Sequence, residues 1–305
     1  MTGLDLLIVG DCNPDLVLRG EDVEPAFGDA ERVVDEAELT VGGSGAIAAC
    51  GAARLGLRTA LASVVGDDPL GRFMLGALGE RGVDVSGVVV RGGARTGVTV
   101  VLVRGSDRAM LTALGTIADL TPELVDRDLL RAARHVHVSS YFLHDGLRLG
   151  LMGLLREARR AGASTSVDPN WDPGEEWDGG LLDLLWETTV LFVNAEEAKQ
   201  IARSGDTEDA AQALARDGAE LVVVKLGAEG ALAVADGRVV RSPPFAVDEV
   251  DTVGAGDSFD AGFLAGHLAG RPLEDALRLA NACGALSMRA AGGTASQPTL
   301  AETAA

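Results

Sequence analysis

The sequence predicts an α/β fold in which helices cover both faces of a largely parallel sheet. From residue 134 to the C-terminus, short apolar runs alternate with helical patterns, as in successive strand–helix units. Polar segments follow several of these runs directly, where the strands of an open α/β sheet end. Two hairpin-like regions, roughly residues 16–40 and 92–113, break the alternation. They predict a small antiparallel sheet apart from the main one, placed to act as a lid.

Composition limits the classes of protein to which the chain can belong. A length of 305 residues suits a single domain, residues 1–305, that includes the lid. The net charge of −20 argues against a nucleic-acid or anionic-membrane partner, because both repel an acidic surface. Cys12, Cys50 and Cys283 lack the spacing of a disulfide framework or a zinc site, which fits a reducing cytoplasm. We expect no signal peptide and no transmembrane helix.

The first apolar run, residues 4–9, predicts a buried strand that ends in a glycine. The polar run Asp11-Cys-Asn-Pro-Asp15 follows it, at the edge where such sheets bind ligands. Asn13 and Asp15 have side chains that can hold hydroxyl groups, and an ordinary polar turn explains them equally well. Residues 16–40 alternate only weakly, as expected for strands of an exposed sheet.

Gly42 and Gly43 belong to a glycine-rich turn that runs into a helix ending near Gly56. Because glycine has no Cβ, backbone N–H groups here can touch a ligand, and a tight helix entry is the alternative. The turn matches neither the dinucleotide fingerprint GxGxxG after a buried strand nor the P-loop GxxxxGK[ST]. A strand at 59–65 follows, and then a helix that begins at Pro69.

The rest of the chain supplies a hairpin and the alternating elements. The hairpin spans 96–113 and turns at Gly105-Ser-Asp107. His135 and His137 alternate with valines, so we interpret them as strand residues and not as ligands. We predict strands at 134–139, 164–167, 189–193, 221–225, 231–235, 238–241 and 245–250, and helices at 69–82, 146–161, 180–187, 196–203, 207–217 and 273–289.

A second glycine-rich turn, with Gly254 and Gly256, opens the helix that follows residue 251. The first N–H groups of a helix are unpaired and lie at the positive end of its dipole, so Val253 to Gly256 predict an anion site. Asp257 follows at the mouth of this site. A carboxylate there is unfavourable unless it has a task such as accepting a proton, but Asp is also a common N-cap. The segment alone leaves both interpretations open.

Two further motifs add groups that phosphoryl transfer needs. Asn194-Ala-Glu-Glu197 offers oxygen ligands for Mg²⁺, with an N-capping Asn and a first-turn Glu as the simpler alternative. Lys225-Leu-Gly227 places one of only two lysines at a strand end, where it can face phosphate or form an ordinary turn. An anion site, Mg²⁺ and one carboxylate base suffice for transfer of a γ-phosphoryl group to a hydroxyl. A Rossmann-type dehydrogenase lacks its fingerprint here.

These motifs resemble, in order and along nearly the whole chain, those of the ribokinase/PfkB family of carbohydrate and nucleoside kinases. The most specific is Asp251-Thr-Val-Gly-Ala-Gly-Asp-Ser-Phe259, which is similar to the family signature DTxGAGDxF. The Gly42-Gly43 stretch, the segment 66–71, the NxxE motif at 194–197 and the xKxG segment around Lys225 add to the resemblance. It implies a ribokinase-like three-layer α/β/α sandwich with a small β-sheet lid, and an ATP-dependent kinase that uses Mg²⁺.

The resemblance also assigns roles to individual residues. Asp257 would be the catalytic base, and the anion hole would consist of Gly254, Ala255 and Gly256. The acceptor would be held by Asn13, Asp15, Gly42 and Gly43. The nucleotide would be held by Asn194, Lys225, Gly227 and Asn281, and Glu197 would bind Mg²⁺ through water. Asp251, with Val253 and the region 287–292, matches a site for a monovalent cation such as K⁺.

Ile47 departs from the family pattern, which usually has Asn at this position of the Gly-Gly helix. Loss of that hydrogen-bonding group leaves the acceptor open between a sugar and a nucleoside, phosphorylated at a hydroxymethyl group. A phosphosugar kinase of the 6-phosphofructokinase type is an alternative, because Arg91, Arg95 and Arg104 lie near the lid. Another is a catalytically silent sugar- or nucleotide-binding protein, although the anion hole and the base are intact. We also expect a homodimer formed through the lid.

Overall fold

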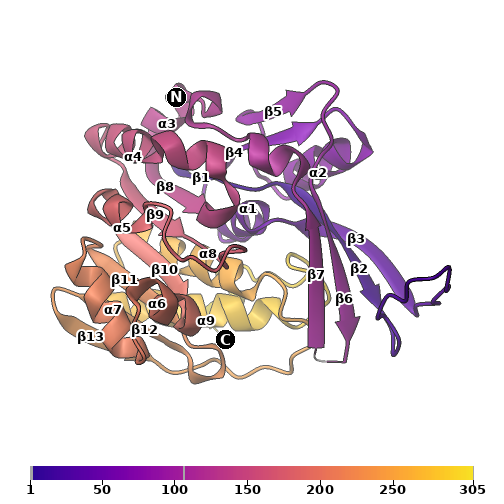
Figure 1. The fold of residues 1–305 in the computed structure, drawn as a ribbon. Helices are drawn as coiled ribbons and strands as arrows, with labels where there is room; N and C mark the ends of the chain where they lie inside the picture. The colour runs from indigo at the N-terminus through magenta and orange to yellow at the C-terminus, as the bar shows by residue number, and fades with distance from the viewer. Residues whose placement is uncertain (1–2, 106, 305) are drawn as a thin grey trace.

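The main sheet has nine strands in the order β13-β12-β11-β10-β9-β8-β1-β4-β5 (Figure 1). The computed structural model describes residues 3–105 and 107–304. Neighbouring strands are parallel except for the pairs β11–β12 and β12–β13. The strands are β1 (Leu4–Val9), β4 (Thr59–Gly66), β5 (Val88–Arg91), β8 (Ala133–Ser139), β9 (Ser164–Asp168), β10 (Val190–Asn194), β11 (Leu221–Lys225), β12 (Ala231–Ala235) and β13 (Arg238–Ser242).

Helices cover both faces of this sheet, and alternate strand residues therefore pack in two separate cores. Leu7 and Val9 of β1 lie in the core under α3 to α7, whereas Leu6 and Ile8 lie in the core under α1, α2, α8 and α9. The predicted three-layer α/β/α sandwich is confirmed. The helices are α1 (Ser44–Arg54), α2 (Pro69–Glu80), α3 (Arg127–Ala132), α4 (Asp145–Arg160), α5 (Leu181–Leu184), α6 (Ala195–Ala202), α7 (Thr207–Arg216), α8 (Ala255–Leu268) and α9 (Leu273–Ser287).

A second sheet of four strands, β3-β2-β6-β7, stands beside the sandwich (Figure 1). Its strands are β2 (Asn13–Arg19), β3 (Glu36–Gly42), β6 (Val98–Arg104) and β7 (Asp107–Ala113). The separate sheet was predicted, but it is not purely antiparallel, because β2 and β6 pair in parallel. Both strands leave the main sheet in the same direction, so they cannot pair otherwise. Of the predicted hairpin tip, Ser106 lies outside the described residues.

Three predictions of secondary structure need correction. The predicted strand at 245–250 is wrong, because this segment is irregular. Pro243 and Pro244 offer no N–H to continue β13, and Val250 donates its N–H to Met288 O (2.8 Å). The predicted helix at 180–187 is α5 followed by a 3₁₀ turn, and β5 was not predicted. The 3₁₀ turns are Gly115–Asp119, Pro122–Leu124, Tyr141–Leu143, Leu185–Glu187, Gly227–Glu229 and Glu302–Ala304.

The parallel strands bring distant polar residues to one edge of the sheet. Ser139 pairs with Asp168 at the ends of β8 and β9, and Asn194 pairs with Lys225 at the ends of β10 and β11. This confirms that the predicted polar motifs converge at the carboxyl edge. Within residues 3–105 and 107–304, no helix is long and apolar enough to cross a membrane.

Candidate active site

Gly42 and Gly43 lie where β3 passes into α1, against the side chains predicted to bind the acceptor. A Cβ on Gly42 would lie 2.0 Å from Asp15 Oδ1, and a Cβ on Gly43 would lie 2.8 Å from Asn13 Oδ1. Gly43 also has φ +78°, which side chains rarely adopt. The two glycines therefore make room for Asn13 and Asp15, and the structure brings all four together.

Asp15 is a buried carboxylate in the lid sheet. Burial raises its pKa to about 7, and the negative charges of Asp11 and Asp251 raise it further in the same direction. Asn13 Nδ2 donates to Thr99 Oγ1 (3.3 Å) and lies 3.5 Å from Asp15 Oδ1. A partly neutral carboxyl beside an amide can both donate to and accept from the hydroxyl groups of a ligand.

The N-terminus of α1 already holds an anion from the protein itself. Asp11 accepts hydrogen bonds from Ser44 N and Gly45 N, both at 3.0 Å. Asn170, after β9, donates to Ser44 Oγ (3.0 Å), and Ser44 lies close enough to Asp257 to lower the pKa of that carboxyl. Ser44 thus links the acceptor side to the start of α8.

Helix α8 begins at a glycine turn that only glycine fits. Gly254 is the N-cap, with φ +70°, and a Cβ there would lie 2.7 Å from Gly293 Cα. Of the predicted anion-binding N–H groups, that of Val253 donates to Asp251 Oδ1 (3.0 Å) and that of Ala255 to Thr252 O (3.3 Å). The N–H groups of Gly256 and Asp257, in the first turn, lack intrahelical partners by geometry. Asp257 itself is not the N-cap, so that simpler interpretation is wrong.

Asp257 lies half-buried in the first turn of α8 among other carboxylates. Burial raises its pKa to about 8, and the negative charge of Asp168 adds to the shift, whereas the Lys225 ammonium opposes it. A carboxyl with such a pKa is a stronger base than an exposed Asp. Perturbed groups of this kind gather at functional sites, and this one lies directly beside an anion site.

Lys225 forms a buried ion cluster immediately behind the anion site. Its Nζ lies 2.5 Å from Asp168 Oδ2 and 3.3 Å from Asp260 Oδ2. A Cβ on Gly256 would lie 3.4 Å from the same Nζ, so the ammonium touches the glycine turn. Burial alone would raise the pKa of Asp168, but the Lys225 ammonium holds it at about 2, whereas burial keeps the pKa of Asp260 well above its usual value. The cluster places the Lys225 ammonium at the start of α8, paired there with the ionised Asp168.

Asn194 and Glu197 form a capping box at the start of α6. Asn194 Oδ1 accepts from Glu196 N and Glu197 N, both at 2.9 Å, and Glu197 Oε2 accepts from Asn194 N (2.8 Å). The amide oxygen of Asn194 is therefore engaged and cannot serve as a direct Mg²⁺ ligand. Glu197 is buried, and burial together with Asp168 raises its pKa to about 7, so a cation placed near it would be favoured. Its chemistry fits Mg²⁺ held through water.

A cavity of about 430 Å³ opens beside the α8 turn. Its walls include Lys225, Gly227, Gly256 and Asn281, so three of the four predicted nucleotide residues lie together beside the predicted anion site, whereas Asn194 does not line this cavity. Asn281 Nδ2 donates to Pro243 O (2.9 Å) and Ser242 Oγ (3.1 Å), and these two bonds do not use its amide oxygen. Within the described residues, no group of three or more His, Cys, Asp and Glu could hold a metal ion alone.

Ile47 packs against the glycine turn and adds no polar group to the acceptor side. A Cβ on Gly254 would lie 2.9 Å from Ile47 Cγ2, and a Cβ on Gly293 would lie 2.6 Å from Ile47 Cδ1. The Ile47 side chain is buried and fills the space between these two backbone segments.

Asp251 ties the glycine turn to the four-stranded sheet and to the segment after α9. Its carboxylate accepts from Val253 N (3.0 Å), Gly292 N (2.9 Å) and Arg19 Nη2 (2.9 Å), the last from strand β2 of that sheet. A second residue of the same sheet, Arg108 of β7, donates to Thr252 Oγ1 (2.9 Å). The predicted partners of Asp251, Val253 and the 287–292 region, are therefore adjacent.

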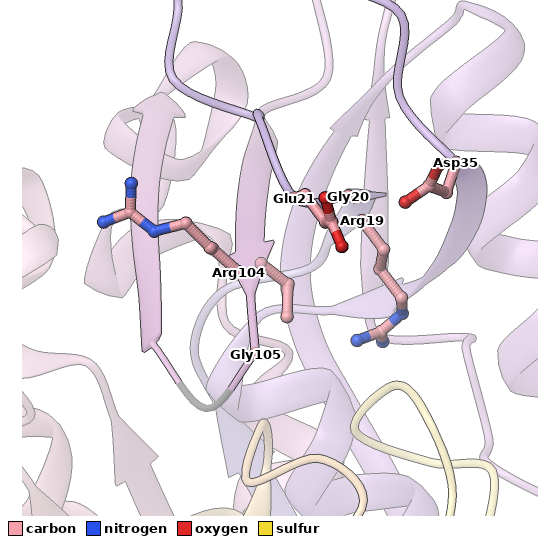
Figure 2. A pocket seen from close by; sticks show the side chains of 7 residues that line it. Arg19, Gly20, Glu21, Asp35, Arg104 and Gly105 are labelled. Carbon is pink, nitrogen blue, oxygen red and sulfur yellow. The ribbon is translucent and has the colours of Figure 1, made fainter.

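The arginines that we considered for a substrate phosphate are dispersed. Arg91 pairs with Asp119 at 2.7 Å, and Arg95 is exposed. Arg104 makes only long contacts, at 3.9 Å to Glu24 and 3.8 Å to Asp107. Figure 2 shows the lid pocket that Arg104 lines together with Arg19, and the two guanidinium groups point away from each other.

His135 and His137 lie on β8, as predicted, and bond to serines of the neighbouring strand. His135 contacts Ser164 Oγ and Ser166 Oγ, and His137 contacts Ser166 Oγ, each at 2.7 Å. Burial lowers the pKa of His137 to about 4, so it is neutral. These side chains stabilise the sheet interior.

Sequence reasoning missed Arg19, Arg108 and Asp260. Asp260 carried a detectable signal, because it follows Asp257 by three residues and so lies on the same helix face. The two arginines carried none, because they meet Asp251 and Thr252 across 232 and 144 residues of chain.

Comparison with known proteins gives one family for nearly the whole chain. The model of the pfkB family carbohydrate kinases matches residues 4–300. The chain is 34% identical over 284 residues to an ATP-dependent ribose-1-phosphate kinase of Halopiger xanaduensis, covering 92% of this chain and 91% of the relative. It is 32% identical over 278 residues to probable fructokinase-4 of Arabidopsis thaliana, covering 86% and 85%.

Solved structures agree with this result in their fold. The adenosine kinase of Sinorhizobium meliloti superposes with a TM-score of 0.87 at 27% identity, covering 100% of both chains. A PfkB protein from Polaromonas sp. JS666 gives a TM-score of 0.84 at 27% identity and covers 99% of both chains.

Proposed function

The chain belongs to the pfkB family of carbohydrate kinases, and from this premise we propose how its site transfers phosphate. It is an ATP-dependent carbohydrate kinase, and we assign to it a hydroxymethyl group of a sugar or nucleoside as acceptor. One observation carries this assignment. A carboxylate with a raised pKa, Asp257, lies in the first turn of a helix whose N-terminus is shaped by glycine to receive an anion.

Asp257 acts as the general base in this proposal. It removes the proton of the acceptor hydroxyl as the oxygen attacks the γ-phosphorus. A pKa of about 8 lets the carboxylate compete for that proton while a useful fraction stays ionised near neutral pH. Ser44 fixes the orientation of the carboxylate and joins it to Asn170 on the acceptor side.

The developing charge on the γ-phosphoryl group meets donors on several sides. The unpaired N–H groups of Gly256 and Asp257 lie at the helix N-terminus, and the Lys225 ammonium, although paired with Asp168, lies close enough behind the turn to donate to a phosphate oxygen. Mg²⁺ bound with ATP would neutralise phosphate oxygens, held through water by Glu197. The cavity lined by Gly227 and Asn281 would hold the nucleotide.

Asp15 and Asn13 bind the hydroxyl groups of the acceptor, with Gly42 and Gly43 allowing close approach. Ile47 contributes no hydrogen bond, so the acceptor relies on the lid residues for polar recognition. This favours an acceptor whose hydroxyl groups point to the lid and whose remaining face is less polar, as in a nucleoside.

A screen of acceptor-dependent ADP release tests the assignment. The protein is incubated with ATP, Mg²⁺ and single members of three panels: sugars, phosphosugars and nucleosides. We expect release of ADP with a member of the first or third panel. Absence of turnover with every acceptor, in protein that still binds ATP, contradicts the assignment and supports the catalytically silent alternative.

A phosphosugar acceptor is the second candidate, favoured by the similarity to the Halopiger ribose-1-phosphate kinase. Against it, Arg19 and Arg104 point apart and Arg91 is paired with Asp119. Among the residues described, these arginines therefore do not form a cluster that could bind a phosphate. Comparison of kcat/KM for a sugar and for its phosphate distinguishes the two candidate acceptors. If the phosphate is preferred and Arg104→Ala removes the preference, the second candidate replaces the first.

The four-stranded sheet is proposed as the lid of this single domain. Arg19 and Arg108 already join it to the anion-site turn, which supports closure over bound ligands. We also propose a homodimer through this sheet, because its edge strand β7 is exposed along its length and shows Met110 and Leu111, 59% and 60% exposed. Sedimentation of wild type and Leu111→Asp tests the dimer, which the charge should weaken.

The cytoplasm remains our proposal for the location, supported by three buried free cysteines. Dependence on a monovalent cation at Asp251 also stays a prediction from the family resemblance. The contacts of this carboxylate favour the opposite inference.

A further inference from the structure

Asp251 is the point at which three segments of the chain meet. Its Oδ1 accepts from Val253 N, and its Oδ2 accepts from both Gly292 N and Arg19 Nη2. The first donor belongs to the glycine turn, the second to the segment after α9 and the third to the lid. The family resemblance places a monovalent cation at this carboxylate, so the fit of such an ion can be judged against these contacts.

The contacts do not fit an additional cation. Oδ2 already accepts two hydrogen bonds and Oδ1 one, which leaves little of the oxygen surface that a cation ligand must offer. Arg19 brings a full positive charge to 2.9 Å from Oδ2, and any ion on the same carboxylate would be repelled by it. The side chains of Arg19 and Asp251 are only 19% and 6% exposed, so water screens this repulsion poorly.

We infer that the Arg19 guanidinium supplies, from within the chain, the positive charge that a monovalent cation would supply at Asp251. Arg19 is then a positioning residue for phosphoryl transfer, and turnover is independent of K⁺. The expected effect on turnover rests on the proposed function. The expected effect on thermal stability does not depend on it.

The path from Arg19 to the anion site is short. Asp251 holds the N–H of Val253, the residue before the N-cap Gly254 of α8. It also holds Gly292, next to Gly293, against which Gly254 packs. An unpaired carboxylate here would repel the phosphates of the nucleotide, so neutralising Asp251 favours both the shape and the charge of the anion site.

Strand β2 gives this arrangement a second consequence. Its first residues include Asn13 and Asp15, which the proposal places on the acceptor, and its last residue is Arg19. One strand therefore fixes both the acceptor site and the charge under the anion site. A monovalent ion cannot couple the two in this way, because it has no covalent link to the lid.

Turnover in two salts tests the inference. Wild type, Arg19→Ala and the control Arg104→Ala are assayed with about 100 mM KCl or with tetramethylammonium chloride, a cation too large for a carboxylate site, at equal ionic strength. We expect less than about twofold difference for wild type and for Arg104→Ala. Arg19→Ala should lose about tenfold or more in kcat without K⁺ and recover most of it with K⁺. Arg104 lines the same lid pocket but does not touch Asp251, so it controls for loss of a lid arginine.

Thermal unfolding in the same salts gives a readout that needs no substrate. The Tm of wild type should be equal in the two salts, and the Tm of Arg19→Ala should be lower and rise with K⁺. Arg19→Gln, which keeps packing without charge, replaces Arg19→Ala if that variant does not fold.

The outcomes separate the inference from the proposed function. The inference is overturned if K⁺ raises the wild-type kcat several-fold or the wild-type Tm by several degrees. It is also overturned if K⁺ neither raises the Tm nor restores the kcat of a folded Arg19 variant. Absence of turnover in wild type in both salts contradicts the proposed function alone, and the melting temperatures still decide the role of Arg19.

Discussion

Helices α1 and α8 begin in the same way and present their N-termini to different partners. Each opens at a glycine with positive φ, Gly43 at +78° and Gly254 at +70°, and neither has a side-chain cap. At α1 the first N–H groups are taken by Asp11, a carboxylate from another part of the chain. At α8 the first turn carries its own carboxylate, Asp257, beside N–H groups that have no such occupant. One glycine turn is therefore occupied by a carboxylate of the protein itself, and the other is the turn to which we assign the reaction.

The comparison explains why the local sequence could not distinguish the two turns. Both were predicted to approach a ligand because glycine lets the backbone come close, and the helix dipole was added only for the turn before α8. The occupant of the α1 terminus lies 33 residues away, so only the tertiary structure shows that it is filled.

Substitution of the two N-cap glycines should show the largest difference between the two turns. Gly254→Ala places a Cβ 2.7 Å from Gly293 Cα, a backbone atom that cannot swing aside, and distorts the anion site. We expect kcat to fall by about 10²–10³. Gly43→Ala places its Cβ 2.8 Å from Asn13 Oδ1 and should mainly raise the KM of the acceptor. Steady-state kinetics on both variants, with folding checked by circular dichroism, would contradict this account if the two losses were alike.

Removal of the Asp11 carboxylate from the N-terminus of α1 should lower the free energy of unfolding and affect turnover only weakly. Asp11→Asn loses the negative charge that faces two N–H groups, and we expect the free energy of unfolding to fall by about 1–2 kcal/mol. Because Asp11 contributes to the raised pKa of Asp257, the variant should also shift the pH–rate midpoint downward. Urea unfolding and a pH profile measure the two effects. An unchanged midpoint would show that the two termini are electrostatically independent.

The carboxylate at α8 should make the protein less stable in alkali. The pKa of Asp257 in the native state is about 8, above its usual value of 3.8, so the native state binds more protons between these values. Stability due to the protonated form is complete below about pH 4 and is lost as the pH rises through about 8. Asp257→Asn is neutral throughout, so its Tm should exceed that of wild type at about pH 9 and match it at about pH 4. Equal Tm values at both pH values would contradict the raised pKa.

The sequence predicted most of the framework, because its signals are local. The strand at 4–9, the glycine-opened helices and the neighbouring strands at 231–235 and 238–241 all follow from residue type and spacing. The error at 245–250 arose because an alternating apolar pattern predicts a strand, whereas Pro243 and Pro244 prevent its pairing. That segment instead lines the cavity beside the α8 turn through Phe245 and Glu249.

The candidate site was predictable where one motif carries it and unpredictable where segments meet. Gly254, Gly256 and Asp257 follow one another, and the structure keeps them together as expected. The buried ion cluster required Lys225, Asp168 and Asp260 to meet from two strands and a helix, and only Lys225 had been assigned a role. The contact of Arg19 with Asp251 depends on how the lid docks, which no local pattern encodes.

Turnover of Asp257→Asn tests the central claim most directly. Asparagine keeps the shape of the side chain and cannot accept the proton, so transfer to the acceptor found in the screen should fall by about 10²–10⁴. Binding of ATP, measured by calorimetry, should remain near that of wild type, because the anion site is left in place. A variant that binds ATP normally and retains a wild-type kcat would contradict the role of Asp257 and the comparison built on it.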